Sequence, residues 1–249
     1  MKKLGSAELF CWQFIQEHLD EIPKLSISQL AEEIHVSPST IVRTLKKKGY
    51  SGYTSFKSIL YYSESKKENG FSKEVNLVIK KNEVEISRTI SQLSVDDIEK
   101  AVYLLSQQEN VLICSSGLNT AVAKEIMYKL RLFGKNCANY NDFDYIQYYA
   151  ERANQKTLVI AVSLSGATPE IIKALECARK RKAKIITITA GATSKMVELS
   201  DVTLFAYKSE HKEVNFGLDV GSRIPLEVVS RILIDTYAVY KRLGPIRKK

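Results

Sequence analysis

Apolar segments alternate with helical segments through the second half of this 249-residue chain. The apolar runs lie at 110–115, 135–140, 156–162, 184–189 and 202–206. Stretches of helical periodicity lie at 120–133, 143–152, 169–182, about 194–199 and 222–243. Strands that are apolar throughout and joined through helices run parallel and are covered on both faces. We therefore expect a five-stranded parallel sheet flanked by helices within residues 107–249.

One connection in this region has the chemistry of an anion site. The strand at 156–162 runs into Ser163-Leu164-Ser165-Gly166-Ala167-Thr168, and Pro169 then begins a helix. Thr168 suits the N-cap and Pro169 the first helical position. A helix start offers unpaired N–H groups and a positive dipole end, which favour an anion. Ser163, Ser165 and Thr168 add hydroxyl donors, while Gly166 lets the backbone bend. We predict a phosphate site here, and a capped turn without a ligand is the alternative.

A second loop, Ser115 to Thr120, follows the first strand. Ligands of an open parallel sheet bind beyond the carboxyl ends of its strands, where the strand order reverses, so we expect both loops to meet there. Ser116, Asn119 and Thr120 could hydrogen-bond a sugar hydroxyl or a phosphate. An ordinary tight turn is the alternative. A dinucleotide site is disfavoured, because the G-x-G-x-x-G fingerprint is reduced to Gly117.

Residues 1–62 are predicted to be helical. An apolar stripe from Leu9 to Leu19 ends before Pro23, and a short helix starts near Ser28. The turn His35-Val36-Ser37 leads to a third helix, from Pro38 to Gly49, and a fourth spans about 54–62. Two short helices separated by a three-residue turn can place the second in the DNA major groove. Its buried seam is expected to comprise Ala31, Ile34, Val36, Ile41, Val42 and Leu45.

Charge supports a nucleic-acid surface in this region. The net charge is +9, and no acid occurs from His35 to Ser63. Ser37, Ser39, Thr40 and Arg43 lie near the start of the third helix, where side chains reach base edges, and Arg43 suits guanine. The lysines of this stretch are suited to contacts with DNA phosphates, and a solvated surface without DNA contacts is the alternative; they are Lys46, Lys47, Lys48 and Lys57. We predict contact with double-stranded DNA through Ser37, Ser39, Thr40, Arg43, Lys46, Lys47 and Lys57.

A polar segment, Glu64 to Gly70, separates this region from two further helices, at 73–93 and after the capping residue Ser94. The predicted domains are therefore a helix-turn-helix domain at 1–70, linker helices at 71–106 and the sheet domain at 107–249. The last helix is apolar on most faces, which suits the core or a subunit interface.

Two stretches resemble known families. ISQLAEEIHVSPSTIVRTLKKKGYSGYTSFKSIL, residues 27–60, resembles the helix-turn-helix domain of the RpiR family of transcriptional regulators, and SLSGAT resembles the phosphate-binding motif of the SIS (sugar isomerase) domain. The resemblance implies a regulator of sugar catabolism, dimeric or of higher order, with a phosphosugar effector. SIS proteins resemble one another by a Gly-x-Gly-x-Ser turn after the first strand. Here Ser115 replaces one glycine and Asn119 stands at the usual serine.

The alternative function is a sugar-phosphate isomerase with an appended helical domain. Isomerisation needs a carboxylate or histidine base. Two of the three histidines, His18 and His35, lie in the DNA-binding region. The third, His211, is flanked by Glu210 and Glu213 in a polar stretch that we interpret as a solvated loop. Alternatively, these three side chains contact hydroxyl groups of the sugar. We therefore predict no enzyme and no catalytic residue.

Nothing in the sequence calls for a cofactor or a metal. The four cysteines are scattered without a CxxC pair. The longest apolar runs fall short of the roughly 18 residues that span a bilayer. We expect a cytoplasmic homodimer, or a higher homo-oligomer, that binds a palindromic operator and a sugar phosphate, with no membrane contact.

Overall fold

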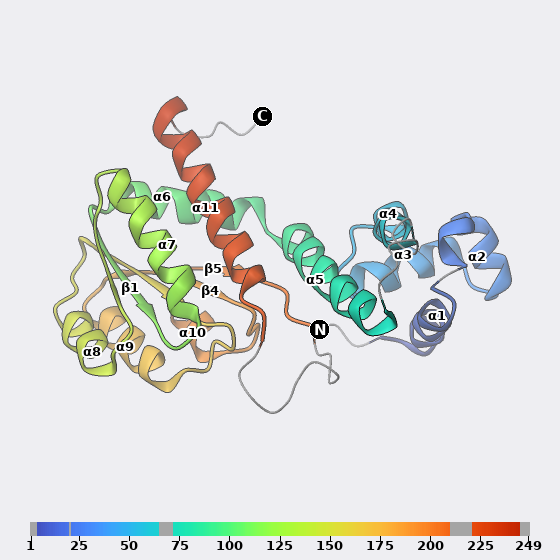
Figure 1. Cartoon of the computed structure of the whole chain (residues 1–249), viewed down its shortest axis with the longest axis horizontal. Helices are drawn as coiled ribbons and strands as arrows, with labels where there is room; N and C mark the ends of the chain where they lie inside the picture. Colours follow the sequence, from blue (N-terminus) through green and yellow to red (C-terminus); the bar gives the residue numbers. More distant parts are fainter. Residues whose placement is uncertain (1–3, 20, 65–71, 210–220, 245–249) are drawn as a thin grey trace. The chain divides into compact units, whose positions relative to one another are not determined.

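The computed structural model describes residues 4–19, 21–64, 72–209 and 221–244. The chain divides into two units, Met1–Gln92 and Leu93–Lys249 (Figure 1). Each unit has its own hydrophobic core and is described by itself.

The first unit is helical. Its elements are α1 (Ser6–Glu17), the 3-10 helix η1 (Ile22–Lys24), α2 (Ile27–Glu33), α3 (Pro38–Lys47), α4 (Tyr53–Glu64) and α5 (Lys73–Gln92). Helix α2 starts with a capping box, in which the Ser26 Oγ accepts from Gln29 N at 3.2 Å and the Gln29 side chain accepts from Ser26 N at 2.8 Å. Ser37 caps α3 by accepting from Thr40 N at 3.2 Å.

The core of this unit joins α1, α2, α3 and α4. Its buried members are Cys11, Ile15, Ile22, Leu30, Ala31, Ile34, Ile41, Leu45, Tyr50, Tyr53, Phe56 and Leu60. The predicted seam is confirmed for Ala31, Ile34, Ile41 and Leu45, and Val36 is partly buried against it. Val42 was assigned wrongly, because it is only half-buried and lies outside this core. Thr44 is buried instead, and its hydroxyl donates to the Thr40 carbonyl at 2.9 Å.

The turn between α2 and α3 has the conformation that a helix-turn-helix needs. His35 has φ +51°, in the left-handed region that glycine usually occupies. Histidine is among the residues that tolerate this region better than bulky apolar ones. The backbone amide of Val36 then donates to the Ala31 carbonyl at 3.0 Å, which closes the turn.

The second unit alternates strands and helices. It comprises α6 (Val95–Gln107), β1 (Asn110–Ser115), α7 (Asn119–Leu132), β2 (Asn136–Tyr140), α8 (Phe143–Glu151), β3 (Thr157–Val162), α9 (Pro169–Lys180), β4 (Lys184–Thr189), α10 (Lys195–Leu199), β5 (Val202–Phe205) and α11 (Ile224–Leu243). The predicted five-stranded parallel sheet is confirmed, and its order is β2-β1-β3-β4-β5.

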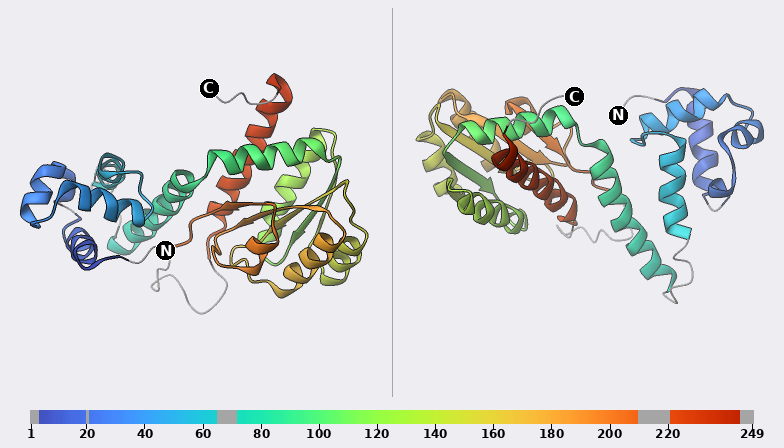
Figure 2. Two further views of the ribbon diagram at one scale, coloured as in Figure 1. Left: turned by 180° about the vertical axis from the view of Figure 1, so that it is seen from behind. Right: turned by 90° about the horizontal axis from the view of Figure 1, so that it is seen from above.

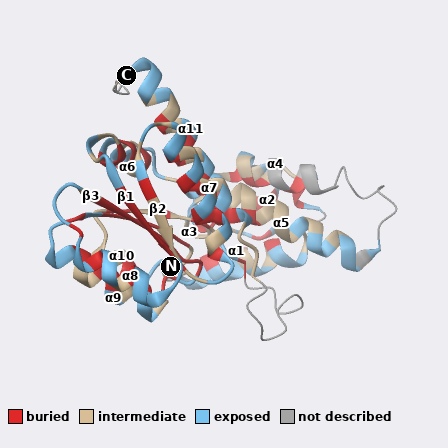
Figure 3. Cartoon of the chain, turned by 60° about the vertical axis from the view of Figure 1, so that its left-hand side comes forward, coloured by how far each residue is buried: buried red, intermediate tan, exposed pale blue. Residues whose placement is uncertain are grey.

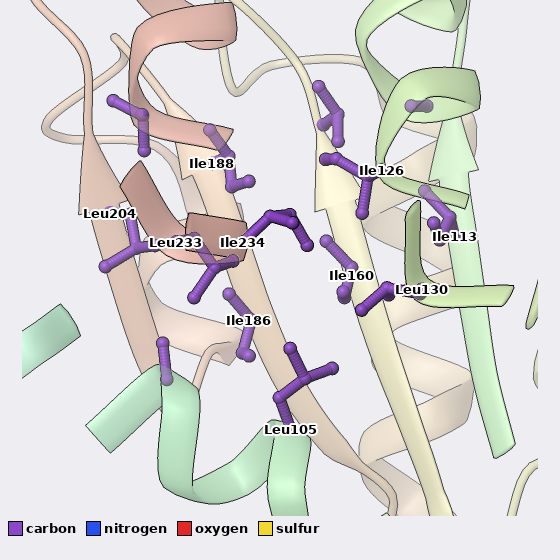
Figure 4. Close-up of a cluster of buried hydrophobic side chains, with 14 of the residues drawn as sticks. Leu105, Ile113, Ile126, Leu130, Ile160, Ile186, Ile188, Leu204, Leu233 and Ile234 are labelled. Atoms are coloured by element: carbon purple, nitrogen blue, oxygen red, sulfur yellow. The ribbon is translucent and has the colours of Figure 1, made fainter. Parts of the chain in front are cut away.

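Helices cover both faces of this sheet. Figures 1 and 2 show α8, α9 and α10 on one side and α6, α7 and α11 on the other. Along each central strand, successive side chains point to opposite faces of the sheet, so they pack into two hydrophobic cores, one on each face. Ile113, Ile160, Ile186 and Ile188 point towards Leu130 and Leu233 of the helices on the second side (Figure 4). The central strands are therefore buried on both faces, as Figure 3 shows.

The strand order reverses between β1 and β3. From β1 the chain crosses through α7 to β2 in one direction, and from β3 it crosses through α9 to β4 in the other. Ser115 and Val162, the last residues of β1 and β3, are partners in the parallel register. The loops that follow these two strands consequently leave the sheet beside each other, at the topological switch point where such sheets bind ligands.

Within the described residues, no helix is both long and apolar enough to cross a membrane.

Candidate functional site

The segment Ser163–Thr168, here called the hydroxyl loop, is held by its own side chains. Ser163 is fully buried, and its Oγ accepts from Gly166 N at 3.2 Å and lies 3.1 Å from the Thr168 Oγ1. Ser165 is exposed, and its Oγ accepts from Ala167 N at 3.2 Å. The loop is therefore preformed, with one serine inside it and one at its surface.

Thr168 occupies the N-cap position of α9, as predicted, but its hydroxyl does not cap the helix. Its Oγ1 contacts Ser163 instead, and within the described chain α9 has no side-chain cap hydrogen bond. The caps of α2 and α3 differ, because Ser26 and Ser37 each accept from a first-turn amide. The positive end of α9 thus remains available to an anion.

Two glycines let the hydroxyl loop pack against the loop after β4. Gly166 has φ +67°, and a Cβ there would lie 2.5 Å from the Ser194 Oγ and 2.9 Å from the Thr189 Oγ1. A Cβ at Gly191 would lie 2.0 Å from the Ser165 carbonyl oxygen. Gly166 was predicted from its place in the motif. Gly191 was not predicted, because its requirement comes from a neighbouring loop.

The second predicted loop, Ser116–Thr120, is built around Asn119, the first residue of α7. Asn119 is only 7% exposed. Its Nδ2 donates to the Ser116 carbonyl at 3.0 Å, and its Oδ1 accepts from the Arg223 Nε at 3.2 Å. Both ends of the amide are therefore engaged by the protein. Gly117 has φ +55°, which turns the chain into α7.

Thr120 and the end of β1 share a further polar contact. The buried Ser115 Oγ lies 3.4 Å from the Thr120 Oγ1 and donates to the Asn139 Oδ1 of β2 at 3.0 Å. Asn139 and Arg223 were not among the predicted residues. The sequence did contain a hint for Arg223. The helix dipole disfavours a cation at the start of a helix, so an arginine at that position could have been singled out as a candidate functional residue.

The predicted sugar contacts Glu210, His211 and Glu213 lie outside the described residues. In the part of the chain that the structure does describe, no group of three His, Cys, Asp or Glu side chains could hold a metal ion.

The exposed surface of α3 carries the predicted DNA-contacting side chains. The Ser37 Oγ lies 2.7 Å from the Ser39 Oγ and 2.9 Å from the Thr40 Oγ1, so hydroxyls cluster at the helix start. Ser39, Arg43 and Lys46 are exposed on the side opposite the buried Ile41 and Leu45. At about 100° per residue these three positions fall within roughly 60° of one another.

The other predicted lysines make contacts within the unit. The Lys47 Nζ lies 2.6 Å from the Glu8 Oε2 of α1. The hydrogen bond from Lys47, together with one from the Gly5 amide at 2.7 Å, lowers the pKa of Glu8. The Lys57 Nζ donates to the Leu25 carbonyl at 2.8 Å, and the Lys48 Nζ lies 4.8 Å from the centre of the Trp12 ring. Arg43 and Lys46 therefore form the outward part of the basic stretch.

Two family models match the chain. The helix-turn-helix domain of the rpiR family matches residues 1–67, and the SIS domain matches residues 104–222. An uncharacterised HTH-type transcriptional regulator of Clostridium perfringens is 28% identical over 235 residues, which cover 90% of this chain and 84% of that protein.

Solved structures share the fold. The Vibrio vulnificus NanR protein, solved in complex with ManNAc-6P, is 23% identical with a TM-score of 0.62, over 97% of this chain and 90% of that one. A candidate sugar-phosphate isomerase from Listeria monocytogenes is 14% identical with a TM-score of 0.60, over 70% of this chain and 94% of that one. At these identities the structures show the fold alone. The rpiR-family helix-turn-helix domain at residues 1–67 and the SIS domain at 104–222 together account for most of the chain, and the chain belongs to the RpiR family.

Proposed function

We propose that this protein is a DNA-binding transcriptional regulator whose operator binding is modulated by a sugar phosphate bound in its SIS domain. The observation that carries the proposal is the preformed hydroxyl loop at the switch point of the sheet, in a chain that begins with an RpiR-family helix-turn-helix. NanR, which shares the fold over nearly the whole chain, was solved with the phosphosugar ManNAc-6P.

In the proposed complex the phosphate lies against the start of α9. Ser165 is the exposed hydroxyl of the loop and donates to a phosphate oxygen, while Ser163 and Thr168 hold the loop in shape. The dipole and the first-turn amides of α9 add to the attraction. Ser116 and Thr120 face the sugar from the neighbouring loop.

The DNA-binding part of the proposal rests on α3. Its exposed Arg43 reads a base edge, and Lys46 contacts a phosphate. We propose double-stranded DNA with a two-fold symmetric operator as the partner, bound by a homodimer, because one α3 per half-site matches the symmetry of such sites.

A sugar-phosphate isomerase is the second candidate function, since its fold is shared by a candidate isomerase. Such an enzyme needs a base beside the sugar carbonyl. Residues 115–120 and 163–168 contain no carboxylate and no histidine. We therefore propose that the site senses its ligand and does not transform it.

A thermal-shift screen of purified protein against hexose, pentose and N-acetylhexosamine phosphates tests the site. A ligand that binds only the native state raises the apparent stability, by about 2.7 kcal/mol at a concentration 100 times its Kd. We expect one sugar phosphate to raise the Tm of the wild type and of Ser106→Ala, and the Ser165→Ala variant to lose this shift. Ser106 is the matched control, because it lies at the end of α6 that leads into the amino end of the sheet.

Operator binding and turnover separate the two functions. We expect the Ser165→Ala variant to bind operator DNA as the wild type does but to ignore the sugar phosphate. If the sugar phosphate still changes operator binding by that variant as it does for the wild type, the proposed site is wrong. Conversion of a sugar phosphate to its isomer by the wild type would overturn the sensing function.

A further inference from the structure

We propose that a basic patch at the amino end of the sheet binds the phosphate backbone of double-stranded DNA, as a second DNA contact besides α3. The inference goes beyond the proposed function, which places DNA on α3 alone, but it rests on that function for the identity of the partner. Four exposed cations of the unit Leu93–Lys249 define the basic patch: Lys156, Lys180, Arg181 and Lys182.

The basic patch lies at the opposite end of the sheet from the proposed effector site. Lys156 directly precedes β3, and residues 180–182 lie where α9 ends and the chain turns towards β4. The two strands are parallel, with Leu158 paired with Lys184, so both connections lie at the amino ends of their strands. The hydroxyl loop follows the carboxyl end of β3. DNA bound at the basic patch therefore leaves the effector site free.

Two of the cations come from separate loops and share one surface feature. Lys156 and Arg181 line an open depression of about 570 Å³, together with Ala153, Asn154 and Gln155. Cations and side-chain amides are groups that contact the phosphates of nucleic acids. Sites for small molecules enclose most of the ligand surface, which this open depression does not do. Its shape and its side chains instead suit a polyanion that lies across it.

The positive charge of this surface is dense and only partly neutralised. Residues 179–184 contain five cations and no acid. Asp201 lies 3.2 Å from Arg179 and 3.5 Å from Lys184, so it offsets part of that charge. Among the described residues, none of the four patch cations has an ion-pair partner. A DNA backbone, with closely spaced phosphates, compensates several such charges at once.

Lys182 occupies a backbone position that glycine suits better. Its φ is +62°, in the left-handed region. Its amide donates to the Arg179 carbonyl at 2.9 Å, and the next amide donates to the Ala178 carbonyl at 3.1 Å. Helix α7 ends with the same two hydrogen bonds, at 2.9 and 3.1 Å, and there the left-handed residue is Gly134. A lysine at the equivalent position of α9 strains the turn, and a role for its charge accounts for that strain.

Duplex DNA suits the basic patch better than a lipid surface does. Helices and loops that lie on a membrane insert apolar or aromatic side chains into it. Residues 152–156 and 179–184 expose no large hydrophobic side chain. Contacts to the DNA backbone need cations alone. Because α3 already brings the chain to DNA, even a weak second contact on the same chain adds to the affinity.

Fluorescence anisotropy of the full-length protein with a duplex that lacks the operator tests the basic patch. The test variant combines Lys156→Gln, Arg181→Gln and Lys182→Gln. Each lost phosphate contact lowers the slope of log affinity against log salt by about 0.9, so we expect this slope to fall by about 2 to 3. At low salt the affinity should fall about tenfold or more.

The matched control combines Lys124→Gln, Lys129→Gln and Arg231→Gln. It removes the same charge from α7 and α11, which cover the other face of the sheet (Figure 1). We expect its slope and its affinity to equal those of the wild type.

Lys182→Gly separates the charge of this residue from its effect on the turn. Glycine relieves the left-handed strain, so the variant should have a higher Tm than the wild type. The loss of one cation should nevertheless lower the salt slope for DNA by about one. A merely structural role for Lys182 would leave that slope unchanged.

Three results would overturn the inference. If the test and control variants bind duplex DNA alike, the patch cations form only a solvated surface, while operator binding through α3 stands. If the test variant keeps its affinity for DNA but loses binding to phosphatidylserine vesicles that the wild type binds, the partner is a membrane surface. If the wild type binds no duplex at all, the proposed function fails together with the second DNA contact.

Discussion

The hydroxyl loop depends on one backbone position that only glycine suits. Gly166 combines φ +67° with a neighbouring serine oxygen 2.5 Å from where a Cβ would lie. The same residue donates its amide to the Ser163 Oγ at 3.2 Å, so any shift of its backbone breaks the contact that preforms the loop. The chemistry of the site therefore depends on a residue that offers no functional group.

Replacement of Gly166 by alanine should be costly for two separable reasons. The left-handed conformation costs about 1–2 kcal/mol with a Cβ, and the clash with Ser194 adds about 1–3 kcal/mol. Gly134→Ala is the matched control, because Gly134 has φ +82° and open space around its Cβ position. Urea denaturation should show a larger loss of unfolding free energy for Gly166→Ala. Equal losses of unfolding free energy in the two variants would mean that the hydroxyl loop accommodates the added Cβ without a further loss of stability.

The sequence did not reveal which side chains contact one another across the fold. The hydroxyl types and their spacing predicted the hydroxyl loop between a strand and a helix, because local pattern alone sets a strand, a turn and a helix start. The contacts of Lys47 with Glu8 and of Arg223 with Asn119 join residues that are 39 and 104 positions apart. Such pairs follow from how whole helices pack, which no local pattern encodes.

At the scale of elements, the sheet was predicted almost in full. Each strand agrees with its expected bounds to within one residue, as β2 and β3 show by starting at Asn136 and Thr157 rather than one residue earlier. Continuous apolar runs mark strands that are buried on both faces, and this signal does not depend on distant partners. The prediction of which α3 side chains are buried was less accurate. Thr44 is buried and Val42 only half-buried because of the way α3 packs against α1 and α2.

Helix α3 should divide its exposed side chains between base reading and phosphate contact. Arg43→Ala should reduce operator affinity by about 1–3 kcal/mol and relax the preference for operator over unrelated DNA. Lys46→Ala should weaken both DNAs alike and lower the slope of log affinity against log salt by about one. Fluorescence anisotropy titrations over several salt concentrations measure both quantities. The same salt slope and the same loss of preference in both variants would contradict this division.

At the scale of the whole molecule, a sensing function requires the effector and the operator to influence each other. The proposed effector binds in the unit Leu93–Lys249, whereas α3 belongs to the unit Met1–Gln92. A sugar phosphate alters operator affinity only if it binds differently to the DNA-competent and DNA-free states of the protein. Coupling energies of this kind are typically 1–3 kcal/mol, or about 5- to 150-fold in affinity.

Thermodynamic linkage makes that requirement measurable in two directions. If the effector changes operator affinity by some factor, the operator must change effector affinity by the same factor. We expect titrations of effector into free protein and into the protein–operator complex to differ by the factor found when operator is titrated with and without effector. Arg43→Ala should leave effector binding to the free protein unchanged, because α3 and the hydroxyl loop belong to separate units. Equal effector affinities with and without operator would show that the SIS domain binds its ligand without regulating DNA, and would leave this chain a binding protein with two independent sites.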